Sequence, residues 1–150
     1  MRYRRIILMK ILFTLLAANM IAISAYSQTN NMKSVTVEIN NVIKNGGTVH
    51  VTVFLNENAY KKRNPDYTFK VAPSSETVKT EISIPFGNCL IFVYQDTNGN
   101  GKFDTNIIGI PKEPVGITNW NGKGHPGSFD KYKVSITKAA QTISINLNPF

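Results

Sequence analysis

The chain has 150 residues, which suits one domain, and its 42% hydrophobic and 17% charged residues form a folding composition rather than a disordered one. The formal net charge is +8, but four of the 17 basic residues lie within residues 1–27, which leaves 13 basic against 9 acidic residues, a net of +4. That modest charge argues against a nucleic-acid binder, and one cysteine with two histidines excludes a disulfide framework within the chain and a zinc site built mainly from Cys and His.

Residues 1–27 have the layout of a secretory signal peptide. An apolar stretch, Ile11–Ile23, follows a basic start and ends in small residues, with Ala25 and Ser27 placed for cleavage before Gln28. The alternative is a retained membrane anchor, because Ile6–Ile23 nearly reaches the roughly 20 residues that span a bilayer. The small residues Ala25 and Ser27 at the end of the apolar stretch favour cleavage. We therefore expect a periplasmic or secreted protein with no stable membrane insertion after cleavage. Residues 28–33 would be a flexible lead and residues 34–150 a single domain.

Five segments of the expected domain alternate between apolar and polar residues, as strands with one buried face do. They are residues 35–40, 48–55, 79–84, 131–136 and 142–147. A sixth segment, Leu90–Tyr94, is apolar throughout and fits a central strand. Turn-forming Gly, Asn and Pro residues separate the segments. No segment keeps a helical period, although residues 57–63 can form one helical turn.

About seven short strands in a domain of about 120 residues predict an all-β fold, a two-sheet antiparallel β-sandwich of immunoglobulin-like or transthyretin-like kind. The alternation places His50 on a polar strand face, where we expect it to be exposed. Cys89 begins the most apolar run, so we expect a buried and inert thiol.

The Asp96–Asp104 run carries the strongest local signal. Side-chain oxygens fall at relative positions 1, 3, 5 and 9, and a glycine falls at position 6, where a calcium-binding loop turns sharply. Position 7 would contribute its backbone carbonyl. The expected ligands are Asp96, Asn98, Asn100, Lys102 and Asp104. Position 12 is Ile107 rather than a glutamate, so a carboxylate from elsewhere must complete the shell, and Glu113 is the nearest candidate.

Few charges surround this expected calcium (Ca²⁺) site. Two carboxylates in the loop, with Glu113 as a third, predict weak affinity, roughly 0.1–1 mM. The alternative is a loop in which Asp and Asn side chains only cap their own backbone. A rigid Pro-containing segment, residues 111–119, either holds Glu113 against the loop or merely crosses one end of the sandwich.

Taken together, Asp96-Thr97-Asn98-Gly99-Asn100-Gly101-Lys102-Phe103-Asp104 and Gly109-Ile110-Pro111-Lys112-Glu113-Pro114-Val115-Gly116-Ile117-Thr118-Asn119 form a combined motif. The motif resembles the bacterial family catalogued as domain of unknown function 2141, and the resemblance extends over nearly the whole expected domain. Phe129 matches an aromatic that follows the motif in that family, whereas Asn88-Cys89-Leu90 departs from it. The resemblance implies an exported sandwich, similar to transthyretin-like and carboxypeptidase-regulatory-like domains that act as binding or structural modules. It implies no activity.

Three functions remain open. The first is an exported binding or structural module with a calcium-stabilised loop, and the second a surface-adhesion or assembly subunit. The third is a hydrolase that uses Asp96, Asp104, Glu113 or His125. No nucleophile–base pair is apparent, so we expect no catalytic residues and no enzyme activity. We expect a monomer with a polysaccharide or protein ligand at the loop end. Trp120 either stacks on such a ligand or folds over the sandwich.

Overall fold

The computed structural model describes residues 31–149, and the predicted signal peptide, residues 1–27, lies outside the described residues. The chain divides into two compact units after Met32, and the described helices and strands belong to the second unit, Lys33–Phe150, except for Met32, the first residue of the first strand. Its strands are β1 (Met32–Asn40), β2 (Thr48–Phe54), β3 (Tyr67–Val71), β4 (Thr77–Pro85), β5 (Gly87–Asp96), β6 (Val115–Ile117), β7 (Val134–Ile136) and β8 (Thr142–Asn146). Its two short helices are α2 (Glu57–Lys61) and α3 (Phe129–Tyr132).

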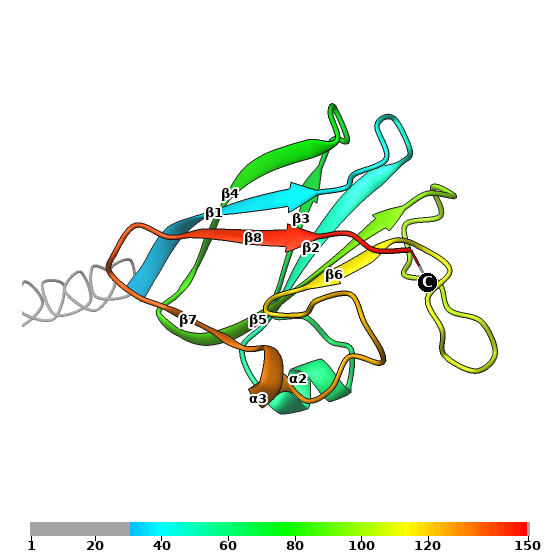
Figure 1. Ribbon diagram of the computed structural model, residues 1–150. Coiled ribbons are helices and arrows are strands. Elements are labelled where there is room, and N and C mark those ends of the chain that lie inside the picture. Colours follow the sequence, from blue (N-terminus) through cyan, green and yellow to red (C-terminus); the bar gives the residue numbers. More distant parts are fainter. Residues whose placement is uncertain (1–30, 150) are drawn as a thin grey trace, which may run out of the picture. The chain divides into compact units, whose positions relative to one another are not determined.

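The strands form two sheets (Figure 1). One has the order β4-β1-β8; the other has the order β3-β2-β5-β6, with β7 paired to the start of β5. The predicted two-sheet β-sandwich is therefore confirmed, with eight strands in the described chain instead of about seven. Six of the eight correspond to the segments predicted from the sequence, and the other two are β3 and the three-residue β6, which lies within the predicted Pro-containing segment.

One pair departs from the antiparallel expectation. β1 and β8 run side by side in the same direction, with Val37 opposite Ile143 and Ile39 opposite Ile145 (Figure 1). β2–β3, β2–β5, β5–β6 and β5–β7 are antiparallel. The parallel pair arises because the chain leaves β7 in one sheet and crosses to the other sheet before β8. Alternation reveals which face of a strand is buried but not the direction of its neighbour.

Alternate side chains of both sheets fill the space between them. Val37 and Ile39 of β1 and Val51 and Val93 of the larger sheet are fully buried in one cluster. Cys89 belongs to this cluster at 0% exposure, which confirms the expected burial. Burial raises the pKa of its thiol to about 11, so the reactive thiolate is scarce at neutral pH.

Both helices cover the other face of the five-stranded sheet, which we call the outer face. Its apolar cluster comprises Phe54, Ala59, Leu90, Ile117, Phe129 and Tyr132. The single turn predicted near residue 57 is α2, whose capping residue Asn56 accepts a hydrogen bond from the Ala59 N–H at 2.9 Å. The strand predicted over 131–136 begins only at Val134. The preceding residues form α3, because Phe129 and Tyr132 are three residues apart and a helical turn buries both on one side.

Candidate functional site

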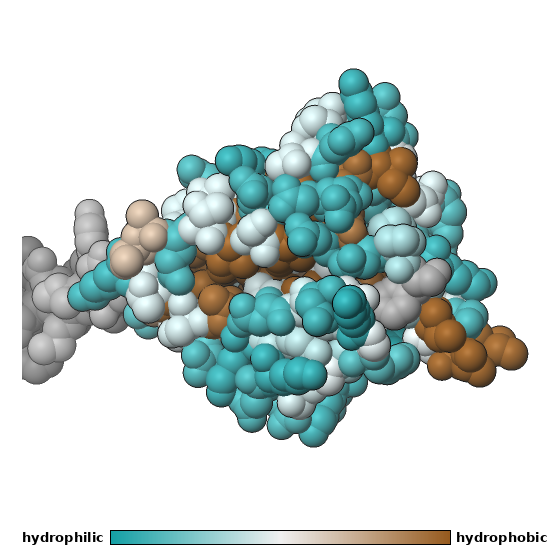
Figure 2. All heavy atoms as spheres, in the orientation of Figure 1, coloured by the Kyte–Doolittle hydropathy of each residue, from teal (hydrophilic) through white to brown (hydrophobic). Residues whose placement is uncertain are grey.

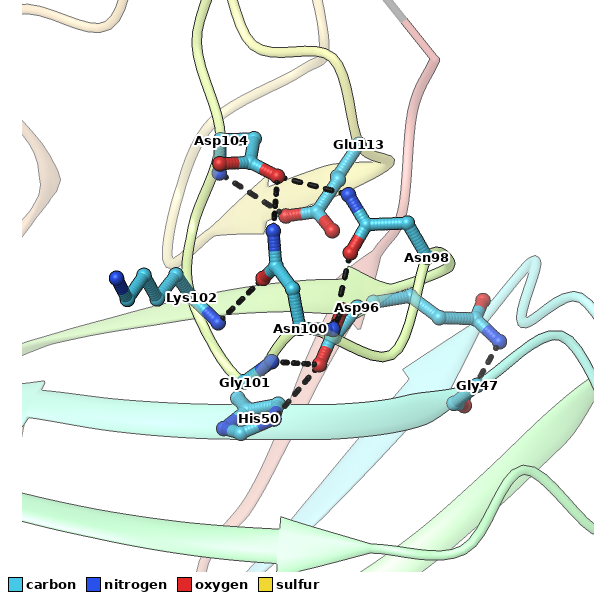
Figure 3. A network of polar contacts seen from close by, with 10 residues as sticks. Gly47, His50, Asp96, Asn98, Asn100, Gly101, Lys102, Asp104 and Glu113 are labelled. Atoms are coloured by element: carbon cyan, nitrogen blue, oxygen red, sulfur yellow. Dashed lines mark hydrogen bonds and ion pairs between the residues drawn. The ribbon is translucent and has the colours of Figure 1, made fainter.

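The Asp96–Asp104 loop begins where β5 ends. Asp96 is 3% exposed, and its carboxylate accepts hydrogen bonds from the backbone N–H groups of Asn100 (3.1 Å) and Gly101 (2.7 Å; Figure 3). Gly99 and Gly101 have φ angles of 73° and 76°, a region that glycine enters without strain. The loop therefore turns back on the carboxylate that starts it, as the glycine at position 6 predicts.

The second half of the loop converges on Asp104. Its Oδ2 accepts hydrogen bonds from Asn98 Nδ2 at 2.7 Å and from Asn100 Nδ2 at 2.6 Å. These two amides, together with the charges of Lys112 and Lys102, hold the pKa of Asp104 below its ordinary value. Asn100 Oδ1 in turn accepts the backbone N–H of Lys102 at 2.8 Å. The two asparagine amides thus occupy a carboxylate oxygen to which a cation would also be attracted.

The segment that follows the loop returns to it and delivers Glu113. The Lys112 N–H bonds to the Asp104 carbonyl at 3.0 Å, and the Asp104 N–H bonds to Glu113 Oε2 at 3.2 Å. Glu113 is 2% exposed, and its Oε1 is a buried atom with no hydrogen-bond partner in the described part of the chain. Burial raises the pKa of Glu113, and the charges of Asp96 and Asp104 add to the rise, whereas the backbone N–H groups of Asp104 and Thr97 oppose it, the Thr97 contact lying outside normal hydrogen-bond geometry.

All six residues predicted as calcium ligands therefore belong to one polar network (Figure 3). Their chemistry fits a hard cation, which prefers oxygen ligands. Their present geometry does not form a finished coordination shell, since residues 31–149 contain no group of three or more His, Cys, Asp or Glu side chains placed to share a metal. The Asn98 and Asn100 side chains direct nitrogen at Asp104 and use their oxygens to accept the backbone N–H groups of Asn100 and Lys102.

The comparison with protein families agrees with the combined motif. The family model described as uncharacterised proteins conserved in bacteria, DUF2141, matches residues 37–144. The chain belongs to the DUF2141 family. No curated protein and no solved structure matches it significantly. The resemblance read from the loop and the Pro-containing segment is confirmed.

The structure explains several motif residues of this DUF2141 chain by backbone packing. A Cβ on Gly116 would lie 2.5 Å from the Asn146 carbonyl oxygen, so only glycine lets β6 approach the end of β8. Asn119 has a φ of 58°, and its side chain donates to the Lys133 carbonyl at 2.9 Å. The second half of the motif therefore fixes the segment that holds Glu113 beside the loop.

His50 does not occupy the exposed position that the strand pattern predicts. It is 3% exposed, stacks on Tyr94 with 4.6 Å between ring centroids, and places Nε2 3.9 Å from Asp96 Oδ2. Burial lowers the pKa of His50, Lys70 lowers it further, and Asp96 opposes them. The prediction was wrong because it treated the outer face as solvated, whereas loops cover it.

The region around Trp120 supports one of the two predicted alternatives. Trp120 packs against the outer apolar cluster, and its Nε1 donates to the Lys123 carbonyl at 3.2 Å. His125 is exposed on the adjoining loop. Ile107 and Ile108 are exposed apolar side chains, and Figure 2 shows a brown patch on a protruding part of the surface. Within residues 31–149, no helix is long and apolar enough to cross a membrane.

Proposed function

We propose that this DUF2141 protein is an exported binding or structural module whose Asp96–Asp104 loop binds calcium, with Glu113 completing the shell. The observation that carries the proposal is the buried, partnerless Glu113 Oε1. A buried polar atom without a partner costs about 1–3 kcal/mol, and a buried carboxylate beside other carboxylates costs more. A divalent cation would satisfy that oxygen and offset the repulsion.

The loop backbone supports the same proposal. Asp96 already accepts two backbone N–H bonds, and the positive φ angles of Gly99 and Gly101 bend the chain toward its carboxylate. Such a preorganised backbone leaves mainly side-chain rotations for the ion to induce. The Lys102 side chain extends away from the carboxylates in Figure 3, so its charge does not fill the place of the ion.

Calcium is expected to raise the melting temperature of the protein. For a site with Kd near 1 mM, about 10 mM calcium stabilises the folded state by about 1.4 kcal/mol, or about 4–8 °C in a domain of this size. Thermal unfolding followed by circular dichroism, with calcium and with a chelator, measures the shift. The same addition should slow proteolysis within residues 97–104.

Asp96→Ala provides the matched variant because it removes a loop carboxylate and leaves the strands intact. Its melting temperature should not respond to calcium. Glu81→Gln, an exposed carboxylate on β4, should respond as the wild type does. Equal melting temperatures for the wild type with and without about 10 mM calcium would show that the loop is only a capped turn.

Export is part of the proposal and has its own test. The basic start, apolar stretch and small residues of residues 1–27 predict cleavage before Gln28. Intact mass spectrometry of protein recovered from the periplasm or the medium should give the mass of a chain that begins at Gln28. A mass that includes residues 1–27 would indicate a retained anchor instead.

The hydrolase alternative receives less support from the same residues. Glu113, whose raised pKa would suit a general acid, is 2% exposed beneath the loop and bonded to the Asp104 backbone. A substrate oxygen has no open approach to such a carboxyl. The surface-adhesion alternative has no comparable observation that favours it, so the calcium-stabilised module remains the preferred function.

A further inference from the structure

The outer face of the five-stranded sheet carries a cavity of about 650 Å³. This volume lies within the range of small-molecule sites, roughly 300–1,000 Å³. The sheet provides one wall, and the opposite walls come from the end of α2, the Asp96–Asp104 loop and the segment around His125. Of the proposed calcium ligands only Lys102 also lines the cavity, and the five that would bind through side-chain oxygens do not, although Asp96 lies 3.9 Å from the lining residue His50.

Strand register explains why the cavity wall is apolar and aromatic. His50 lies opposite Tyr94 and Thr52 opposite Phe92, and all four side chains point to the outer face. Phe103 from the loop packs edge-on against Phe92 with 5.0 Å between ring centroids. The aromatic rings therefore support one another and form a preorganised surface rather than a collapsed core.

The charged residues that line the cavity are all cationic. Arg63, Lys70 and Lys102 lie at the rim, and no aspartate or glutamate lines the cavity. Within residues 31–149, none of these three side chains forms a salt bridge with a carboxylate. The positive charge of Lys70 helps to lower the pKa of His50, which lines the cavity, so this charge is felt inside the cavity. An apolar cavity edged by unpaired cations is complementary to a molecule with an apolar body and an anionic end.

We propose that this cavity binds a small amphipathic organic anion, with its apolar body against Phe92, Tyr94 and Phe103 and its carboxylate or sulfonate at Arg63 and Lys70. The aromatic wall supplies the area to bury, and the rim cations select the charge. This proposal does not depend on calcium. A neutral apolar molecule would leave the rim cations without a counter-charge and should bind more weakly.

Anilinonaphthalene sulfonate is a suitable probe, because phenylnaphthylamine has the same ring system without the sulfonate. Fluorescence titration of the folded protein should show one site for the sulfonate and at least tenfold weaker binding of the neutral analogue. The double variant Arg63→Gln/Lys70→Gln should lose about tenfold in affinity for the sulfonate and leave the neutral analogue unaffected. Lys138→Gln, which removes a charge outside the cavity lining, is the control and should bind as the wild type does.

A second variant tests the place of binding. Thr68 is exposed on β3 and lines the cavity, so Thr68→Trp should fill the space and abolish binding of both probes while the melting temperature is retained. The titrations are run with and without calcium, which separates this proposal from the loop proposal. Equal affinity for the two probes, or sulfonate binding unchanged in the double variant, would overturn the anion site. Undiminished binding in Thr68→Trp would overturn its location.

Discussion

Gly47→Ala is expected to cost about 3–5 kcal/mol of unfolding free energy, a large share of the 5–15 kcal/mol of a typical domain. Gly47 precedes β2 and has a φ of 95°, and an added Cβ would lie 1.9 Å from the Asp96 carbonyl oxygen. The segments that contain Gly47 and Asp96 cannot move apart easily. The buried side chain of Gln95, the residue before Asp96, forms hydrogen bonds with the backbone of both Ile43 and Gly47. The midpoint of urea unfolding measures the loss.

Gly87→Ala is the matched control for that variant. Gly87 has a φ of 114°, but no atom lies within 4 Å of the position that its Cβ would take. Gly87→Ala should therefore lower the free energy of unfolding only through the unfavourable backbone conformation, by about 1–2 kcal/mol. The difference between the two variants isolates the close approach between the start of β2 and the end of β5. Equal losses would mean that this approach relaxes without cost.

Glu113→Gln is expected to change the response to calcium without weakening the calcium-free fold. The glutamine keeps an oxygen for the Asp104 N–H and removes a buried charge that Asp96 and Asp104 repel. The calcium-free variant should therefore be as stable as the wild type, or more stable by about 1 kcal/mol. Calcium should no longer raise its melting temperature. Chemical unfolding in chelator and thermal unfolding in calcium measure the two effects.

The capped-turn alternative predicts a different pair of results for Glu113→Gln. If Glu113 serves only as a cap for the loop, the weaker acceptor lowers the calcium-free stability by about 1 kcal/mol, and neither protein responds to calcium. Glu81→Gln again serves as the control for removing a negative charge elsewhere. A variant that keeps the full calcium response would remove Glu113 from the proposed shell.

Local patterns in the sequence predicted the sandwich because burial of one strand face shows as alternation. The same pattern is present in Tyr67–Val71, yet this strand was not among the predicted segments. β6 is too short to alternate; it pairs with β5, and Gly116 permits its close approach to the end of β8. The parallel pairing of β1 with β8 depends on the path of the chain between sheets, which no local pattern encodes.

The loop spacing predicted which polar residues would gather around Asp96, and the structure brings them together. The spacing did not predict that Glu113 Oε1 would be buried without a partner, because this depends on how the returning segment packs. The exposed position predicted for His50 was wrong for a related reason. A strand alternates in the same way whether its second face meets water or meets covering loops, so the cavity on the outer face was beyond local reasoning.

The parallel pairing of β1 with β8 has a consequence for the time course of folding. Asn40 and Asn146 are neighbours across 106 residues of chain, and β1 lies at the centre of its sheet. A nascent chain that emerges from its N-terminal side presents β1 long before β8 exists. Until β8 is available, one edge of β1 keeps its backbone N–H and C=O groups unpaired. Such an edge favours aggregation and slow folding. The pairing of β1 with β8 is therefore expected to be one of the last steps of folding.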